Sequence, residues 1–242
     1  MSKTLLILGG SSDIGMSTIE KLHENFDNII AHYYSTSERL ENLKEKLGNK
    51  LHLMQADFSD NSSTEKFVLD VENIDIPTHI LHLPAAKFTN NNFHKSKWDD
   101  VQKDIDISLR SIYKITNHFI KKMIKSKNCK IVFMLSSVTA QSPKFLVNYT
   151  MVKYALLGFM KSLAVEYADK HININALSPS MIETKFLQDI PNIMVEQSAM
   201  NNPMKRNANV EDIMGVIELL LSEKSNYITG QNIVISGGSI IQ

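Results

Sequence analysis

Short apolar runs alternate with amphipathic stretches along the whole chain. The short runs predict seven strands, at residues 5–8, 28–32, 51–56, 79–83, 130–135, 173–177 and 232–235. Stretches with apolar residues at helical spacing predict helices over residues 14–24, 37–47, 61–71, 98–125, 149–167 and 210–221. Strands that are apolar on both faces and alternate with helices form parallel sheets covered on both sides. The pattern therefore predicts an α/β fold of the Rossmann type, with a doubly wound parallel sheet and helices on both faces.

The pattern continues without a linker or an internal repeat, so one domain over residues 1–242 is expected. Only residues 185–209, rich in Met, Asn and Pro, show little periodicity. A long irregular segment in a compact domain is usually a lid, a binding loop or a disordered segment.

The composition limits the classes of partner that the chain is expected to bind. The chain has 26 Lys and Arg against 26 Asp and Glu, so nothing favours nucleic acid or an anionic membrane as a partner. Its apolar runs are too short to cross a bilayer or to act as a signal peptide, which predicts a cytoplasmic protein. The single cysteine, Cys129, is expected to be a bystander at the start of a strand rather than a reactive thiol. His79 and His82 are three apart on a strand and would face opposite sides, so no metal site is predicted.

A glycine- and serine-rich turn, GGSSDIG at residues 9–15, joins the first strand to the first helix. Glycines permit close approach of the backbone to a pyrophosphate, and a helix N-terminus supplies N–H donors and partial positive charge. A turn of this kind is also often only a turn. As the first strand–helix connection of a parallel sheet it predicts a dinucleotide site made by Gly9, Ser11, Ser12, Asp13, Ile14 and Gly15.

The end of the second strand bears on the choice of dinucleotide. NAD-preferring enzymes usually carry Asp or Glu there for the ribose hydroxyls, whereas this chain has AHYYSTSER at residues 31–39, without a carboxylate where one is expected. Tyr33, Ser35, Thr36 and Arg39 would suit a 2′-phosphate, so NADP(H) is favoured, with NAD(H) as the alternative. Capping of the next helix by Ser37 is a compatible structural explanation.

Tyr149 and Lys153 are four residues apart at the start of the strongest predicted helix, so their side chains share one face. A tyrosine with its ordinary pKa of about 10 is a poor proton donor or acceptor at neutral pH, and a nearby ammonium lowers that value. The neighbouring Ser136 and Ser137 end the preceding strand and offer a hydroxyl to orient a carbonyl. The combination predicts acid–base chemistry at a carbonyl group.

These motifs resemble the short-chain dehydrogenase/reductase family, in its 3-oxoacyl-carrier-protein-reductase-like branch, over essentially the whole chain. The resemblance implies hydride transfer between a ketone and a secondary alcohol, with Tyr149 as acid or base and with Lys153 lowering its pKa and binding the nicotinamide ribose. Ser137 is favoured as the catalytic serine by alignment of the motif SSV, whereas Ser136 gives the common spacing of thirteen residues to the tyrosine. The family's remaining cofactor contacts correspond to Asp57, Phe58, Pro84, Ala85, Pro179, Ile182 and Thr184. A homo-oligomer, tetramer or dimer, is also implied.

Three positions depart from the family pattern. Leu83-Pro84-Ala85-Ala86 replaces the usual NNAG, Ser108 stands where the family has its catalytic Asn, and Asp13 replaces a glycine of the phosphate turn. Ser108 is expected to hold a proton-relay water through its hydroxyl. Because of these changes, a catalytically weak regulatory dinucleotide-binding protein is the alternative to an enzyme.

The family places its substrate loop at residues 185–209. Met194, Met200 and Met204 offer apolar contact there, while several Asn and Gln suit hydroxyl-rich ligands. The segments HLPAAK and SPSMIETKFL are similar to segments of reductases from bacterial surface-glycan and flagellin-modification pathways. A sugar-derived small-molecule substrate is therefore expected, with a 3-oxoacyl thioester as the alternative.

Overall fold

The computed structural model describes residues 2–35, 38–86, 92–188 and 190–241. Within these residues, seven parallel strands form one sheet in the order β3-β2-β1-β4-β5-β6-β7. The strands are β1 (Thr4–Leu8), β2 (Asn28–Tyr33), β3 (Leu51–Gln55), β4 (His79–His82), β5 (Cys129–Met134), β6 (Ile172–Pro179) and β7 (Asn232–Ile235). All seven predicted strands are confirmed, with ends that differ by at most two residues.

The order of the strands reverses between β1 and β4, which lie side by side at the middle of the sheet. Leu6 of β1 is opposite Ile30 on one side and Ile80 on the other. All five side chains of β1 are buried, as expected for a strand covered by helices on both faces.

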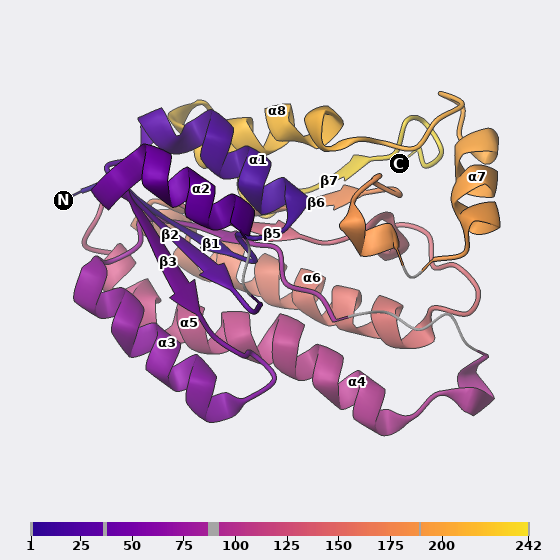
Figure 1. Ribbon diagram of the computed structural model, residues 1–242, viewed down its shortest axis with the longest axis horizontal. Helices are drawn as coiled ribbons and strands as arrows, with labels where there is room; N and C mark the ends of the chain where they lie inside the picture. Colours follow the sequence, from indigo (N-terminus) through magenta and orange to yellow (C-terminus); the bar gives the residue numbers. More distant parts are fainter. Residues whose placement is uncertain (1, 36–37, 87–91, 189, 242) are drawn as a thin grey trace.

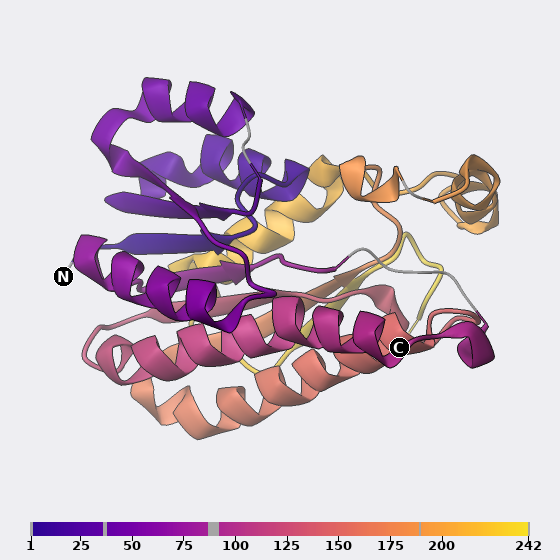
Figure 2. The ribbon, with the colours of Figure 1, turned by 60° about the horizontal axis from the view of Figure 1, so that its bottom comes forward.

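Two helical layers enclose the sheet (Figures 1 and 2). One face packs against α1 (Asp13–Leu22), α2 (Glu38–Leu47) and α8 (Val210–Leu221). The other packs against α3 (Asn61–Ile74), α5 (Ser111–Met123) and α6 (Val147–Tyr167), with α4 (Trp98–Asp104) leading into α5. Each interface is a continuous apolar core, one containing Ile19 and Ile217, the other Phe119 and Leu156. The predicted doubly wound fold is confirmed.

The helix predicted over residues 98–125 is interrupted. A π-helical turn, Ile105–Arg110, separates α4 from α5. Here serine hydroxyls bond within the helix, from Ser108 Oγ to Asp104 Oδ1 at 2.6 Å and from Ser111 Oγ to the Ile107 carbonyl at 2.5 Å. The Ser111 bond to a carbonyl four residues earlier competes with regular helical pairing, and π-turns are frequent at functional sites.

The weakly patterned segment 185–209 contains a helix, α7 (Asn192–Asn201). None of its residues is buried, which explains why no amphipathic period marks it in the sequence. Figure 1 shows α7 standing beyond the carboxyl ends of β6 and β7. Among the described helices, none is long and apolar enough to cross a membrane.

Candidate active site

The predicted site residues gather at one edge of the sheet, where the parallel strands have their carboxyl ends. The glycine turn follows β1, Tyr33 ends β2, Asp57 follows β3, Pro84 follows β4, Ser136 follows β5 and Pro179 ends β6. In open α/β sheets this edge, at the reversal of strand order, is where ligands bind. Ser35 lies exposed after β2, whereas Thr36 falls outside the described residues.

The glycine turn is tightly fixed to β2. Gly9 has a φ of +83°, and its N–H donates to Nδ1 of His32 at 3.1 Å, while the Gly10 N–H donates to the His32 carbonyl at 2.7 Å. A Cβ on Gly15 would lie 2.7 Å from the carbonyl oxygens of Gly9 and Gly10. Ser12 caps α1 by accepting the Gly15 N–H. This crowded turn at a helix N-terminus fits the pyrophosphate of a dinucleotide.

Asp13 points toward neighbouring cations and amides. Its carboxylate pairs with Arg39 Nη1 at 2.7 Å through Oδ1 and accepts the Lys185 backbone N–H at 2.9 Å through Oδ2. Partial burial opposes ionisation of this carboxyl, but the Lys185 N–H and Arg39 outweigh it and hold the pKa of Asp13 below its ordinary value. Arg39, predicted to meet a 2′-phosphate, is therefore paired within the protein.

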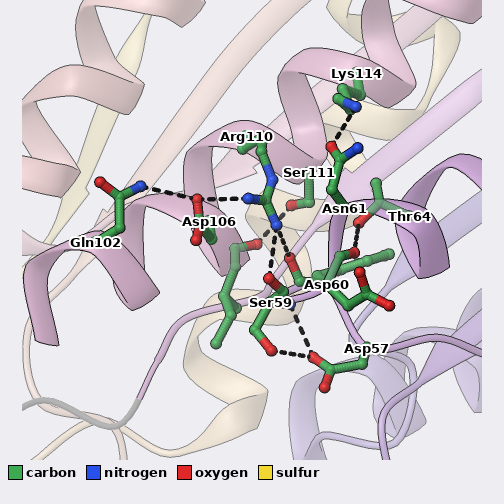
Figure 3. Close-up of polar contacts among 12 residues, drawn as sticks. Asp57, Ser59, Asp60, Asn61, Thr64, Gln102, Asp106, Arg110, Ser111 and Lys114 are labelled. Atoms are coloured by element: carbon green, nitrogen blue, oxygen red, sulfur yellow. Dashed lines mark hydrogen bonds and ion pairs between the residues drawn. The ribbon is translucent and has the colours of Figure 1, made fainter. Parts of the chain in front are cut away.

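The segment after β3, predicted to hold the adenine, is braced from the π-turn (Figure 3). Arg110 donates to the carbonyls of Phe58 at 3.1 Å and Ser59 at 2.8 Å, and it pairs with Asp106 at 2.8 Å. Asp57 accepts from the N–H and the hydroxyl of Ser59 at 2.8 and 2.6 Å. Phe58 is buried, and its ring stacks on that of His32. Sequence reasoning gave Arg110 no role, since its partners are backbone carbonyls distant in the chain.

Lys153 is buried beneath Tyr149 on α6. Its ammonium donates to the Met134 carbonyl at 3.1 Å and lies 5.5 Å from the centre of the Tyr149 ring. Burial lowers the pKa of Lys153 to about 8, against the opposing effect of the Asp104 charge. The two side chains do share one helical face, as predicted.

The hydroxyl of Tyr149 forms a hydrogen bond with the side chain of Ser136. Ser136 has an extended backbone, whereas Ser137 opens a short 3₁₀ turn in which its carbonyl accepts from the N–H groups of Ala140 and Gln141. The geometry therefore favours Ser136 over Ser137, the residue chosen from the motif alignment. The spacing of thirteen residues to Tyr149 was the sequence signal for it.

The acidity of Tyr149 differs from the sequence-based expectation. Burial raises the pKa of Tyr149 to about 12; the Ser136 hydrogen bond opposes this rise and the Asp104 charge adds to it. Lysine was expected to lower that pKa, but the Lys153 ammonium lies against the ring and donates to Met134. Desolvation of the phenol has the largest effect on the pKa of Tyr149.

Ser108 is fully buried in the π-turn, and its hydroxyl donates to Asp104 at 2.6 Å. The Ala86 N–H donates to the same carboxylate oxygen at 3.3 Å. The sequence analysis did not single out Asp104. The signal that could have found it is its position four residues before Ser108, which places the two side chains on one helical face.

The segment after β6 runs back toward the glycine turn. Ile182 is buried in the core shared with α1 and α8 and forms a β-bridge with Ala208, and the Thr184 hydroxyl donates to the Ile182 carbonyl at 3.4 Å. Lys185 follows and reaches Asp13. This return places the two ends of segment 185–209 against the Rossmann core.

Comparison with known proteins gives the family. Residues 9–239 match the family model described as enoyl-(acyl carrier protein) reductase. The chain is 30% identical over 243 residues to the 3-oxoacyl-[acyl-carrier-protein] reductase FabG of Buchnera aphidicola, covering 98% of this chain and 96% of that protein. The chain belongs to the short-chain dehydrogenase/reductase family. The oxidoreductase YmfI of Bacillus subtilis is also 30% identical, over 247 residues, covering 98% of this chain and 99% of its own.

Solved structures of short-chain dehydrogenases and reductases share the fold. Levodione reductase superposes with a TM-score of 0.88 at 24% identity, covering 98% of this chain and 96% of its own. A 4-hydroxyisoleucine dehydrogenase complexed with NADH does so with the same TM-score, 0.88, at 25% identity, covering 98% of each chain.

Cys129 and the two histidines of β4 are buried in the core. Cys129 is buried at the start of β5, and burial raises the pKa of its thiol to about 11, which disfavours the reactive thiolate. His79 packs edge-on against Phe26 in one core and His82 lies by Phe133 in the other, so they do face opposite sides. In the described part of the chain, no group of three or more His, Cys, Asp or Glu is arranged to hold a metal ion.

Proposed function

We propose that this protein is an NAD(P)(H)-dependent oxidoreductase that interconverts a ketone and a secondary alcohol. One observation carries the proposal: the Tyr149 hydroxyl meets Ser136 beside the buried Lys153 ammonium, at the same sheet edge as the glycine turn. Hydroxyl, phenol and ammonium are the groups that polarise a carbonyl and exchange a proton with it.

In reduction, Tyr149 donates a proton to the carbonyl oxygen, and in oxidation it accepts the alcohol proton. Ser136 donates a hydrogen bond that orients the same oxygen. Lys153 supplies positive charge that stabilises the phenolate whenever it forms. The nicotinamide cofactor supplies or accepts the hydride when bound, held by the glycine turn, the backbone at Asp57 and Phe58, and the segment around Thr184.

NADP(H) is the favoured cofactor in this proposal, with NAD(H) as the alternative. Residues 33–35, where β2 ends, contain no carboxylate, which supports this preference. Arg39, half-exposed in the first turn of α2, supports it as well. Fluorescence titration should give tighter binding of NADPH than of NADH. Equal affinities, or a preference for NADH, would remove this part of the proposal.

Segment 185–209 is proposed to bind the substrate, of which two classes compete. The amides of Asn202 and Asn207 donate to the carbonyls of Ser236 and Val195, so they are not free for a sugar-derived substrate. Met200 and Met204 are 71% and 60% exposed, which suits an acyl chain. Together with relatives named 3-oxoacyl-[acyl-carrier-protein] reductase, this favours a 3-oxoacyl thioester over a keto sugar.

Turnover with a substrate panel tests the proposed function. Purified protein is mixed with NADPH or NADH and with keto sugars, 3-oxoacyl thioesters or simple ketones, and consumption of the reduced cofactor is followed by its absorbance. We expect turnover with at least one class, highest for the thioesters. If neither cofactor were consumed with any class while dinucleotide binding was retained, the regulatory binding protein would be the better description.

A further inference from the structure

Asp104, the last residue of α4, is a buried acid without a role in the chemistry described so far. The residue is only 7% exposed. One oxygen, Oδ1, accepts both the Ser108 hydroxyl and the Ala86 N–H. Both donors are neutral, and a buried carboxylate held by neutral donors alone is costly.

The buried cation of the site lies on a neighbouring helix. Helix α4 and the π-turn pack against α6, which carries Lys153 and Tyr149. Lys153 is only 3% exposed, and its ammonium donates to the neutral Met134 carbonyl. The Asp104 charge raises the pKa of this ammonium, against the larger lowering effect of burial. Burial raises the pKa of Asp104, and the Ser108 hydroxyl, the Lys153 charge and the Ala86 N–H oppose that rise, so the two buried charges support each other.

The other ionisable groups around this pair do not compete with it. His82, from β4, is fully buried, and burial lowers its pKa to about 3, so it is neutral at working pH. Asp106, in the π-turn itself, is paired with Arg110. The Asp104 charge also raises the pKa of Tyr149, because a nearby anion opposes ionisation of the phenol.

The site departs from the family in the same place. Ser108 stands where a short-chain dehydrogenase has its catalytic Asn, and its hydroxyl is directed to Asp104. A serine–carboxylate pair thus replaces an amide, and it brings a negative charge that an amide lacks.

We propose that Asp104 is a positioning residue of this site: its buried carboxylate is the counter-charge that keeps Lys153 protonated beside Tyr149. The consequence for catalysis rests on the proposed function, whereas the pairing itself does not. Loss of the charge lowers the proton affinity of both Lys153 and Tyr149, because an anion favours the ammonium and disfavours the phenolate.

The pairing is measured without turnover, by titrating lysine side-chain ¹³Cε resonances by NMR. Lys153, with its pKa near 8, stands apart from ordinary lysines, which titrate near pH ~10.4, and Lys153→Met assigns its signal. Asp104→Asn keeps the shape and an oxygen for Ser108 and Ala86 but removes the charge. The Lys153 midpoint should fall by about one pH unit. Asp100→Asn, which removes an exposed charge from the same helix, should leave it unchanged.

The reciprocal titration covers the case in which Asp104→Asn does not fold. In Lys153→Met, the Asp104 carboxyl should titrate at higher pH than in the wild type, since coupling between two sites is mutual. An unmoved Lys153 midpoint in folded Asp104→Asn, or an unmoved Asp104 midpoint in Lys153→Met, would overturn the proposal.

The catalytic consequence is read from the pH profile of ketone reduction. Loss of activity as Lys153 deprotonates should begin at lower pH in Asp104→Asn than in the wild type or Asp100→Asn. If Asp104 had a purely structural role, Asp104→Asn would lower the rate equally at every pH. That result would refute the catalytic part of the proposal. If the NMR midpoints shift but no variant or wild type turns over any substrate, the pairing stands and the proposed function fails.

Discussion

At the scale of single residues, the site depends on which of two adjacent serines meets Tyr149. Ser136 continues the extended course of β5, whereas Ser137 begins a 3₁₀ turn, so the two backbones diverge at this point. Motif alignment cannot resolve such a divergence, because shifting the alignment by one residue exchanges the serine that is assigned to the site. The spacing to Tyr149 carries more information, since it counts residues between two fixed elements.

Ser136→Ala should lower kcat for ketone reduction by about 100-fold or more, because a hydrogen-bond donor to the carbonyl oxygen is lost. Ser137→Ala is the matched control and should change kcat much less. Steady-state kinetics of the two variants, with circular dichroism to confirm folding, make the comparison. The reverse order of effects would restore Ser137 as the catalytic serine.

At the scale of elements, regular strands and helices follow from apolar periodicity, and both exceptions have local causes. The helix over residues 98–125 is interrupted by the π-turn, where the Ser111 hydroxyl bonds to the Ile107 carbonyl, a feature that no hydrophobic pattern records. Helix α7 buries none of its residues and so leaves no period to detect. The strand-end positions of the site residues were predictable, because parallel strands bring their carboxyl ends to one edge.

Asp13 connects three elements, α1, α2 and the start of segment 185–209, and this connection makes a prediction about cofactor binding. Asp13→Gly, which restores the residue typical of the family, releases Arg39. NADPH affinity should rise relative to NADH by about three- to tenfold, a modest gain because the ion pair is partly exposed.

The double variant Asp13→Gly with Arg39→Ala is the control, and it should show no gain in NADPH preference. Fluorescence titration of both dinucleotides gives the ratios. A gain that persists without Arg39 would mean that Asp13 acts on the phosphates directly.

At the scale of the whole molecule, the sequence predicted the fold and the convergence of the site but not its electrostatics. Nothing in the order of residues reveals that Tyr149 loses enough water to raise its pKa, or that Asp104 lies close enough to act on it. Both effects depend on which groups the folded chain excludes from solvent. The role of Asp104 therefore required the structure.

We also propose that the outer face of α5 and α6 is the contact of a homo-oligomer, a tetramer or a dimer. Tyr113, Tyr154 and Val165 are 54%, 43% and 83% exposed on these helices. Light scattering should give more than one chain per particle, and Val165→Asp should reduce that number. Leu69→Asp, at an exposed apolar position of α3, is the control. A wild-type monomer would exclude the proposed contact.

Three buried histidines predict acid sensitivity. Burial lowers the pKa of His32 to about 4 and those of His79 and His82 to about 3, well below the unfolded value of about 6.5. The unfolded chain thus binds more protons below pH ~6.5, so stability falls as the pH is lowered toward about 4, by about 1.4 kcal/mol per pH unit for each histidine.

Urea unfolding at fixed protein concentration, at pH 7 and at pH 5, measures this loss. His82→Leu should reduce the pH dependence by about one third, since it removes one of the three groups. A free energy of unfolding that does not change between these two pH values would contradict the burial of neutral histidines.

The central claim is that Tyr149 exchanges the proton during hydride transfer, and Tyr149→Phe tests it most directly. Reduction of the best substrate from the panel by NADPH is measured for the wild type, for Tyr149→Phe and for Tyr154→Phe, a half-exposed tyrosine of the same helix. Tyr149→Phe should lose about 10²- to 10⁴-fold in kcat with little change in NADPH affinity, while Tyr154→Phe keeps wild-type turnover. Equal rates for the wild type and Tyr149→Phe would contradict the claim.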